Sequence, residues 1–141
     1  MNLPKTTTRV EEHTSPRVNA RIRDAMERRI SRYAKAPQAE RKRRLEELDR
    51  EWDIERAIEA NAAGAVLLGL LLGRFVNSRF YAFPGMVASF LMLHALQGWC
   101  PPVPALRRLG FRTEHEIDEE RRALEEIKRR RSHEPTQLSP F

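Results

Sequence analysis

Charged side chains are almost absent from one 40-residue stretch of this chain and dense in the rest of it. Residues 61–100 carry two charged side chains, Arg74 and Arg79, whereas the remaining 101 residues carry 44 of the 46 in the chain. An apolar stretch of this length must be covered on every side, and the flanks offer only scattered Leu, Ile and Trp to cover it. The sequence therefore predicts a membrane segment between polar ends and nearly excludes a water-soluble fold.

Two apolar runs between residues 57 and 100 are each suited to a membrane-spanning helix. The first covers about residues 57–76, and the second covers residues 80–100 without a fixed charge. A span needs about 20 predominantly apolar residues, and the short connection allows only a tight turn. We therefore expect an all-α membrane protein with an antiparallel two-helix transmembrane hairpin, flanked by charged amphipathic helices.

Residues 16–56, before the hairpin, predict two charged cytoplasmic helices. Ser15 and Pro16 are typical of a helix start, and Pro37 interrupts the helix that follows. Apolar side chains recur every four residues in this first helix, so it either lies on an anionic bilayer surface or docks on another helix. The second helix is expected to run from Gln38 into the first span without a break.

Residues 101–131, after the hairpin, predict a proline-rich exit and an amphipathic helix. Thr113 and Glu116 have the spacing of a capping box, and Ile117, Leu124 and Ile127 mark the apolar side of the helix that it starts. The two ends of the chain, residues 1–15 and 132–141, are polar or without periodicity, and we expect them to be disordered.

The orientation of the hairpin follows from its basic flanks. Two arginines lie in the connecting loop, whereas many more basic residues lie within about 20 residues of the outer ends of the spans. These are Arg41, Lys42, Arg43, Arg44, Arg50, Arg56, Arg107, Arg108 and Arg112. Both termini are therefore expected in the cytoplasm.

Small residues occupy one face of the first span. Ala65, Gly69 and Gly73 follow one another at intervals of four, which allows close approach of another backbone in lipid. Three interpretations stay open. The face packs on the second span of the same chain through Gly85 and Ser89, it forms a homodimer, or the spacing is coincidental.

Three polar side chains in the spans suggest a hydrogen-bonded clasp. His94 and Gln97 lie one turn apart on the second span, at a depth that an antiparallel hairpin matches to Asn61 on the first. Such contacts orient membrane helices. A role of His94 in handling protons or a ligand is the alternative, although the spans contain no acidic partner in the same region.

Cys100 is the single cysteine, so an intrachain disulfide and a Cys-rich metal site are excluded. The residue ends the second span at the cytoplasmic interface. A helix C-terminus disfavours a thiolate, although Arg107 and Arg108 would compensate if the proline turn folds back. Inert packing and redox, persulfide or ligand chemistry therefore both remain possible for this thiol.

Other chemistry finds little support in the sequence. His115 and Glu116 lack the second histidine of a zinc-protease motif, and no nucleotide-binding or hydrolase motif occurs. Residues 1–60 carry 15 basic and 12 acidic groups, and residues 101–141 carry nine and eight, so neither flank has the basic excess typical of nucleic-acid binding. We expect no catalytic residue, no cofactor, no bound metal and no nucleic acid.

A short motif after the second span resembles a known family. Gly98-Trp99-Cys100-Pro101-Pro102, followed by LRRLGFRT at 106–113 and EID at 116–118, is similar to the YgaP-like inner-membrane domain family of bacteria. The resemblance covers roughly residues 50–125. It implies a two-helix hairpin of unknown function in the bacterial inner membrane, found alone or fused to a rhodanese sulfurtransferase that dimerises through its membrane helices. Cys100 would be the family cysteine, without implied enzyme activity, because no rhodanese domain is present.

Three functional hypotheses follow. The first is a non-enzymatic bacterial inner-membrane protein, with both tails cytoplasmic, that self-associates or anchors a cytoplasmic protein. In the second, Cys100 accepts or passes sulfur together with a separately encoded sulfurtransferase. The third is a peripheral helical protein that binds anionic lipid without crossing the bilayer.

Overall fold

The computed structural model describes residues 5 and 7–133, and the regular structure in this part of the chain is helical throughout. This confirms the predicted all-α class. In chain order the elements are α1 (Arg9–Glu12), α2 (Pro16–Lys35), α3 (Gln38–Leu48), α4 (Ile54–Phe75), the 3-10 helix η1 (Ser78–Tyr81), α5 (Ala82–Gln97), α6 (Val103–Leu109) and α7 (Glu114–His133).

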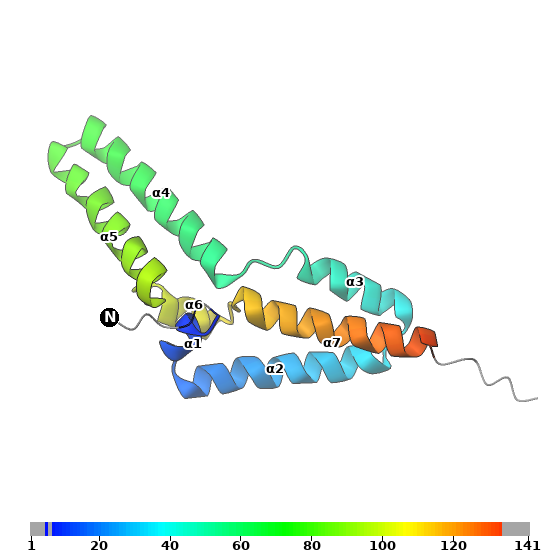
Figure 1. Cartoon of the computed structure of the whole chain (residues 1–141). Helices are drawn as coiled ribbons and strands as arrows, with labels where there is room; N and C mark the ends of the chain where they lie inside the picture. Colours follow the sequence, from blue (N-terminus) through cyan, green and yellow to red (C-terminus); the bar gives the residue numbers. More distant parts are fainter. Residues whose placement is uncertain (1–4, 6, 134–141) are drawn as a thin grey trace, which may run out of the picture.

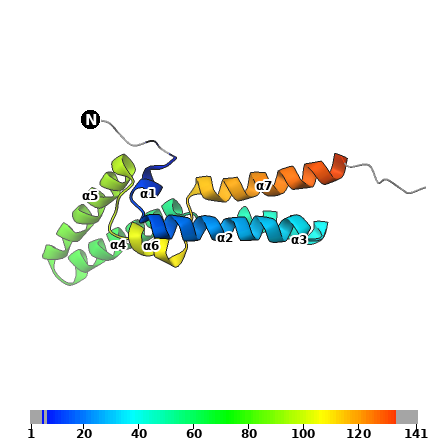
Figure 2. The ribbon, with the colours of Figure 1, turned by 90° about the horizontal axis from the view of Figure 1, so that it is seen from below.

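The helices form two regions that meet at one end. Helices α4 and α5 run antiparallel as a hairpin, and α2, α3 and α7 lie side by side as a bundle (Figure 1). The short helices α1 and α6 sit where the two regions join, as the view from below also shows (Figure 2). The hairpin therefore projects away from the charged bundle and contacts it only near its base.

The two helices of the hairpin are long and apolar enough to cross a membrane. The 22 residues of α4 extend about 33 Å, and η1 with α5 gives 20 residues or about 30 Å, close to the thickness of a bilayer core. In the most apolar 18-residue stretch of each helix, only 17% of α4 and 6% of η1 with α5 is buried inside the protein. Their outward side chains are large and apolar, and include Leu67, Leu68, Leu71, Phe75, Met86 and Met92.

The expected continuous helix from Gln38 into the first span is wrong, because α3 ends at Leu48 and α4 begins at Ile54. Asp53 caps α4 by accepting a hydrogen bond from the backbone N–H of Arg56 at 2.6 Å. The backbone N–H of Ile54 donates to the carbonyl of Arg112 at 2.8 Å. The carbonyl of Arg112, nearly 60 residues further along the chain, thus accepts a backbone N–H at the start of α4 that a continuous helix would pair internally.

The N-terminal segment was expected to be disordered, and the structure corrects this for the residues it describes. Val10 in α1 is buried at the base of the hairpin, in one cluster with Ile54, Ile58 and Val103. A short polar segment with one well-placed apolar side chain gives no periodic signal, so its order depends on this tertiary contact. Residues 1–4, 6 and 134–141 lie outside the described part, and His133 still belongs to α7.

The bundle has a small apolar core between α3 and α7. Leu48, Ile117 and Leu124 are buried together, which confirms the predicted apolar side of α7. The predicted capping box is also confirmed, because the N–H of Thr113 donates to Glu116 at 2.9 Å and the N–H of Glu116 donates to the Thr113 hydroxyl at 3.2 Å.

The apolar stripe of α2 turns inward rather than toward a bilayer. Ile22 and Met26 are buried, and α2 packs beside α7. Of the two alternatives for this helix, docking on another helix therefore matches the structure. Its basic side chains occupy the remaining faces and stay accessible.

Two glycines adopt positive φ, and their surroundings differ. Gly98 ends α5 with φ 78°, and Gly110 ends α6 with φ 97°. A Cβ built on Gly98 would lie 2.6 Å from the backbone carbon of Arg9, whereas a Cβ on Gly110 would meet nothing within 4 Å. The close approach at Gly98 is what lets α1 dock on the end of the hairpin.

This difference predicts that Gly98→Ala releases α1 and Gly110→Ala does not. Both substitutions carry the strain of a positive φ, about 1–2 kcal/mol, and only the first adds a backbone clash. Trypsin cleavage after Arg9, followed by mass spectrometry, should become clearly faster in Gly98→Ala than in the wild type and the matched Gly110→Ala variant. Equal cleavage rates in the two variants would show that α1 does not depend on this contact.

Candidate functional site

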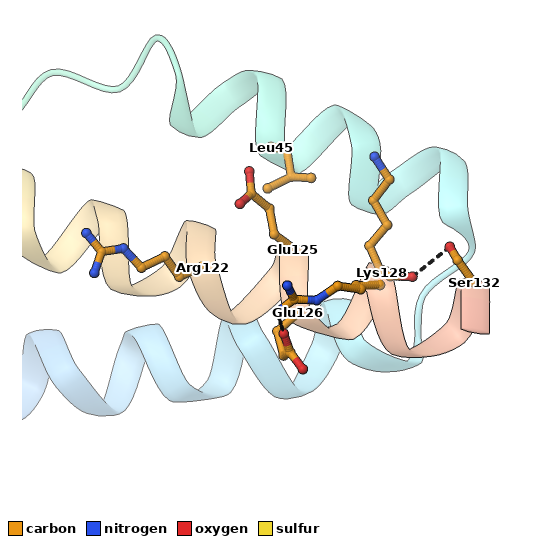
Figure 3. Close-up of a pocket in the computed structure, with 7 residues that line it drawn as sticks. Leu45, Arg122, Glu125, Glu126, Lys128 and Ser132 are labelled. Atoms are coloured by element: carbon orange, nitrogen blue, oxygen red, sulfur yellow. Dashed lines mark hydrogen bonds and ion pairs between the residues drawn. The ribbon is translucent and has the colours of Figure 1, made fainter. Parts of the chain in front are cut away.

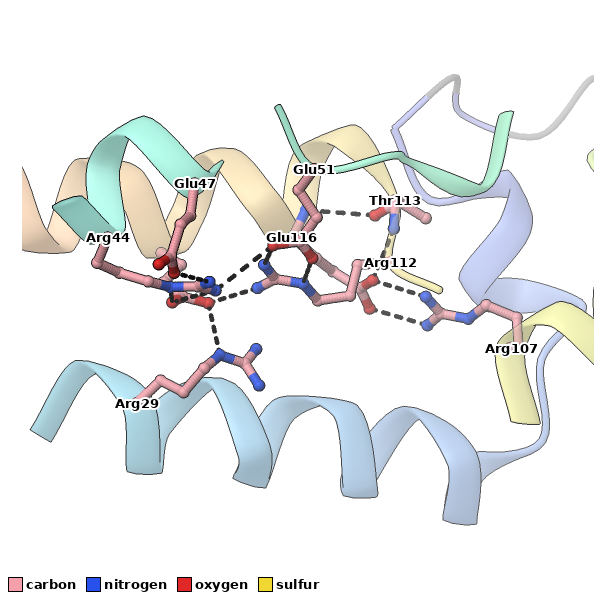
Figure 4. Close-up of polar contacts among 9 residues, drawn as sticks. Arg29, Arg44, Glu47, Glu51, Arg107, Arg112, Thr113 and Glu116 are labelled. Carbon is pink, nitrogen blue, oxygen red and sulfur yellow. Dashed lines mark hydrogen bonds and ion pairs between the residues drawn. The ribbon is translucent and has the colours of Figure 1, made fainter. Parts of the chain in front are cut away.

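Glu120 on α7 is fully buried, and its carboxylate binds arginines from three other segments. These arginines, Arg29, Arg44 and Arg112, are labelled in Figure 4. Oε2 of Glu120 accepts from Nε of Arg29 on α2 at 3.0 Å, and its Oε1 accepts from Nε of Arg44 on α3 at 3.0 Å. Arg112, in the α6–α7 connection, donates its Nη1 to the same carboxylate. One side chain therefore ties together all three helices of the bundle.

Arg112 extends the network to the segment between α3 and α4. Its Nε and Nη2 donate to the two carboxylate oxygens of Glu51, at 2.8 and 2.7 Å. Arg112 is itself buried, with both acidic partners in direct contact. A bidentate pair of this kind fixes the direction of the chain where it leaves the bundle and enters the hairpin.

A second buried pair links α6 to α7 and α2. Arg107 is fully buried and donates to both oxygens of Glu116, at 2.6 and 2.8 Å. Its Nη2 also donates to the side-chain oxygen of Asn19 at 2.8 Å. The arginines that served to orient the hairpin in the sequence analysis therefore include three buried residues, Arg41, Arg107 and Arg112.

The two buried carboxylates are held ionised. Burial alone would raise the pKa of Glu120, but hydrogen bonds and charge from Arg44, Arg112 and Arg29 outweigh it and place this pKa below its ordinary value. Burial would likewise raise the pKa of Glu116. Its contacts with Arg107 and Thr113 outweigh this effect, and the pKa of Glu116 is lowered. Because these oxygens are engaged by arginines, the network serves structure rather than acid–base chemistry.

The lowered pKa values predict a loss of stability in acid. The unfolded state takes up protons near the ordinary glutamate pKa of 4.5, above the folded-state values of Glu120 and Glu116. The free energy of unfolding that they contribute is therefore fully present above about pH 4.5 and is lost as the pH falls through their lower folded pKa values.

Substitution of Glu120 tests this directly. At pH 7, Glu120→Gln should lower the free energy of unfolding by about 3–5 kcal/mol, because three arginines lose a buried partner. The matched exposed variant Glu125→Gln should change it by less than about 0.5 kcal/mol. Denaturation of the detergent-solubilised chain at pH 7 and pH 3.5 should also show a smaller acid effect in Glu120→Gln. An unchanged acid dependence would remove Glu120 from this role.

Cys100 is buried at the base of the hairpin, in the cluster that contains Val10 and Val103. Burial raises the pKa of its thiol above the ordinary value. Arg107, which was considered as a compensating cation, is engaged by Glu116 instead. Of the two interpretations of this thiol, inert packing therefore agrees with the geometry.

The small-residue face of α4 is occupied within the chain. A Cβ on Gly69 would lie 2.7 Å from Pro84, and a Cβ on Gly73 would lie 2.7 Å from the ring of Tyr81. The expected partners Gly85 and Ser89 are wrong, since a Cβ on Gly85 would meet nothing within 4 Å and the Ser89 hydroxyl donates to the carbonyl of Gly85. Ala65, the third residue of this face, is half-buried.

The predicted polar clasp does not form in the described structure. His94 is buried, but neither of its ring nitrogens has a hydrogen-bond partner, and Asn61 and Gln97 are exposed. Depth in a hairpin follows from sequence position, whereas rotation about the helix axis follows from packing. His94 lies instead near the ion pair of Arg9 with Glu55, at the base of the hairpin.

The glycine contacts predict how strongly the hairpin depends on each position. Gly69→Ala and Gly73→Ala should each lower the thermal unfolding temperature in detergent, because a methyl group would overlap Pro84 or Tyr81. Gly85→Ala should leave this temperature unchanged or raise it, because alanine favours the helix and the space is open. If Gly69→Ala instead abolished a chemically crosslinked dimer without changing the unfolding temperature, the face would be intermolecular.

A surface hollow of about 770 Å³ lies between α3, at Leu45, and the second half of α7 (Figure 3). It is lined by side chains of both signs around Leu45, and Glu126 is already paired with Arg129 and Arg130. The Ser132 hydroxyl donates to the carbonyl of Lys128 in the same turn. This hollow therefore has the character of a solvated helix surface.

A smaller hollow of about 360 Å³ has a different lining. It lies between α2 and α6, and arginine side chains from both helices and from the α6–α7 connection surround it without an acidic residue in the lining. Elsewhere in residues 5 and 7–133, no group of three or more His, Cys, Asp or Glu side chains is placed to hold a metal ion. The arginine-lined hollow is thus the surface site with the most distinctive chemistry.

Sequence reasoning missed the buried network and this hollow because their members are spread over the whole chain. A signal was nevertheless present, since Arg107 and Arg112 stand among apolar residues directly after the hairpin. Comparison with protein-family models, curated proteins and solved structures finds no match. The resemblance to the YgaP-like family therefore remains a prediction from the motif around Cys100.

Proposed function

We propose that this chain is a two-span membrane anchor, with α4 and α5 crossing the bilayer and the bundle of α2, α3 and α7 standing at one surface. The observation that carries this proposal is the lack of burial along the hairpin. Leu67, Leu71 and Met92 are more than half exposed although they lie in the most apolar part of the chain. In water this surface would be an aggregation site, and in lipid it needs no further cover.

The ends of the hairpin support the same placement. Phe80 and Tyr81 stand at its tip and Trp99 at its base, as aromatic side chains do at the two interfaces of a bilayer. Arg74 stacks over Phe75 near the tip, where its long side chain reaches the interface. The charged residues Glu55 and Glu59 lie in the first turns of α4, near the bundle. The apolar length between these ends fits a bilayer core.

The orientation that we propose is a cytoplasmic bundle in a bacterial inner membrane. The bundle and both described ends of the chain lie on the same side of the hairpin. The basic residues concentrate on that side, which favours the cytoplasm. The ordered bundle would then offer its charged helices to a cytoplasmic protein, and the hairpin would hold that protein at the membrane.

The other functions receive less support from the geometry. Self-association through Ala65, Gly69 and Gly73 would have to displace Pro84 and Tyr81 from that face. Sulfur transfer needs an accessible thiol of lowered pKa, and Cys100 is buried with a raised one. A purely peripheral protein would leave the apolar surface of the hairpin in water.

Extraction and site-directed labelling test the anchor and its orientation together. Alkaline carbonate should leave the protein in the membrane pellet, whereas a peripheral protein would be released. In a Cys100→Ala background, Ser78→Cys at the hairpin tip should react with a membrane-impermeant maleimide in spheroplasts. The matched exposed variant Ser31→Cys on α2 should react only after the cells are opened. The opposite labelling pattern would place the bundle outside the cytoplasm.

A further inference from the structure

The arginine-lined hollow between α2 and α6 carries positive charge that no carboxylate in the described part of the chain neutralises. Among the described residues, Arg21, Arg28 and Arg108 have no carboxylate within 4.0 Å, in contrast to the paired arginines of the bundle. Arg21 donates to the backbone carbonyl of Arg108 at 2.6 Å, which holds its guanidinium between the two helices. Three unneutralised cations on one hollow favour a bound anion.

The buried network fixes a fourth donor at the same place. Arg29 also lines the hollow, and it binds Glu120 through Nε alone. Its two Nη atoms have no protein partner in the described part of the chain, and they form the outer end of the guanidinium (Figure 4). Because the bond from Nε to the buried carboxylate fixes the guanidinium of Arg29, its two Nη atoms are pre-organised to donate to an anion.

The hollow also has an apolar side chain at its edge. Leu109, at the end of α6, is 77% exposed and lines the hollow next to Arg108. Only residues 98–102 separate α6 from the last residue of α5, so the hollow lies at the base of the hairpin. If the hairpin crosses a bilayer as proposed, this is the level at which headgroups begin.

We infer that this hollow, which we call the arginine groove, binds the phosphate group of an anionic lipid in the leaflet next to the bundle. Arginine matches phosphate oxygens with paired N–H donors, and Leu109 offers an apolar contact to the start of an acyl chain. The inference rests on the proposed anchor for the source of the phosphate. The capacity of the groove to bind an anion depends only on the side chains that line it.

Titration of the full chain in a neutral detergent tests the groove. The probes are dihexanoyl phosphatidylglycerol, dihexanoyl phosphatidylcholine and inorganic phosphate, and binding is followed by calorimetry. We expect the phosphatidylglycerol to bind most tightly. The double variant Arg28→Gln, Arg108→Gln should weaken this binding by about 10- to 30-fold, because two cations next to the phosphate are lost.

The matched control removes the same number of charges away from the groove. Lys35 and Arg50 are exposed and form no ion pair among the described residues. The double variant Lys35→Gln, Arg50→Gln should change the affinity by less than about twofold, because distant surface charges are screened. Equal weakening in both double variants would mean that net charge, and not the groove, attracts the lipid, and it would overturn the inference.

Two further outcomes also decide the matter. If inorganic phosphate binds as tightly as the phosphatidylglycerol and loses affinity in the groove variant, the groove holds a free phosphate and the lipid assignment is wrong. If no probe distinguishes the groove variant from the wild type, the groove is not an anion site. Carbonate extraction of the same variants separates this from the anchor, because loss of the groove should leave the protein in the membrane pellet.

Discussion

The buried carboxylate of Glu120 is the constraint on which the bundle of α2, α3 and α7 depends. A carboxylate without water or a cation around it would be strongly unfavourable, so its burial requires that Arg29, Arg44 and Arg112 all be in place. These arginines come from α2, α3 and the α6–α7 connection. The network therefore forms only when every helix of the bundle has its native position, and a missing partner leaves an unpaired charge.

The bundle relies on these buried ion pairs because it contains few buried apolar residues. Its core consists of Leu48, Ile117 and Leu124 with partly buried neighbours, which is too small to select one arrangement of three helices by burial alone. The buried ion pairs have a defined geometry, and they therefore fix the relative positions of the helices around this small core. Through Glu51, the same Arg112 also sets where the chain leaves the bundle, so the ion pairs of the bundle orient the apolar hairpin.

Much of the fold could be predicted from local patterns. The start of α2 at Pro16, its end before Pro37 and the capping box of Thr113 and Glu116 are all encoded by neighbours in the sequence. The break between Leu48 and Ile54 could not be predicted in this way. Local periodicity favours a continuous helix there, and the interactions that interrupt it come from Arg112, about 60 residues further along the chain.

The candidate sites also combine features that local sequence predicts with features that only packing determines. Depth along the hairpin is a matter of counting residues, but the rotation of each helix decides which side chains meet, and for this reason Asn61 and Gln97 face outward while His94 is buried. Gly69 and Gly73 were recognised as a contact face, whereas Pro84 and Tyr81 as their partners depend on how the tight turn directs α5. The arginine groove likewise combines residues of α2 and α6 that no local pattern connects.

Local sequence patterns suffice to predict the helical class, the apolar hairpin and most helix ends, because hydrophobic periodicity, capping and proline act over a few residues. The burial of particular charges and the place of Cys100 in an apolar cluster depend on the tertiary fold. The same holds for Arg21, Arg28 and Arg108, which have no carboxylate partner among the described residues. The physical reason is that the energy of a charge depends on its surroundings in space. Those surroundings come from segments that are far apart in the chain.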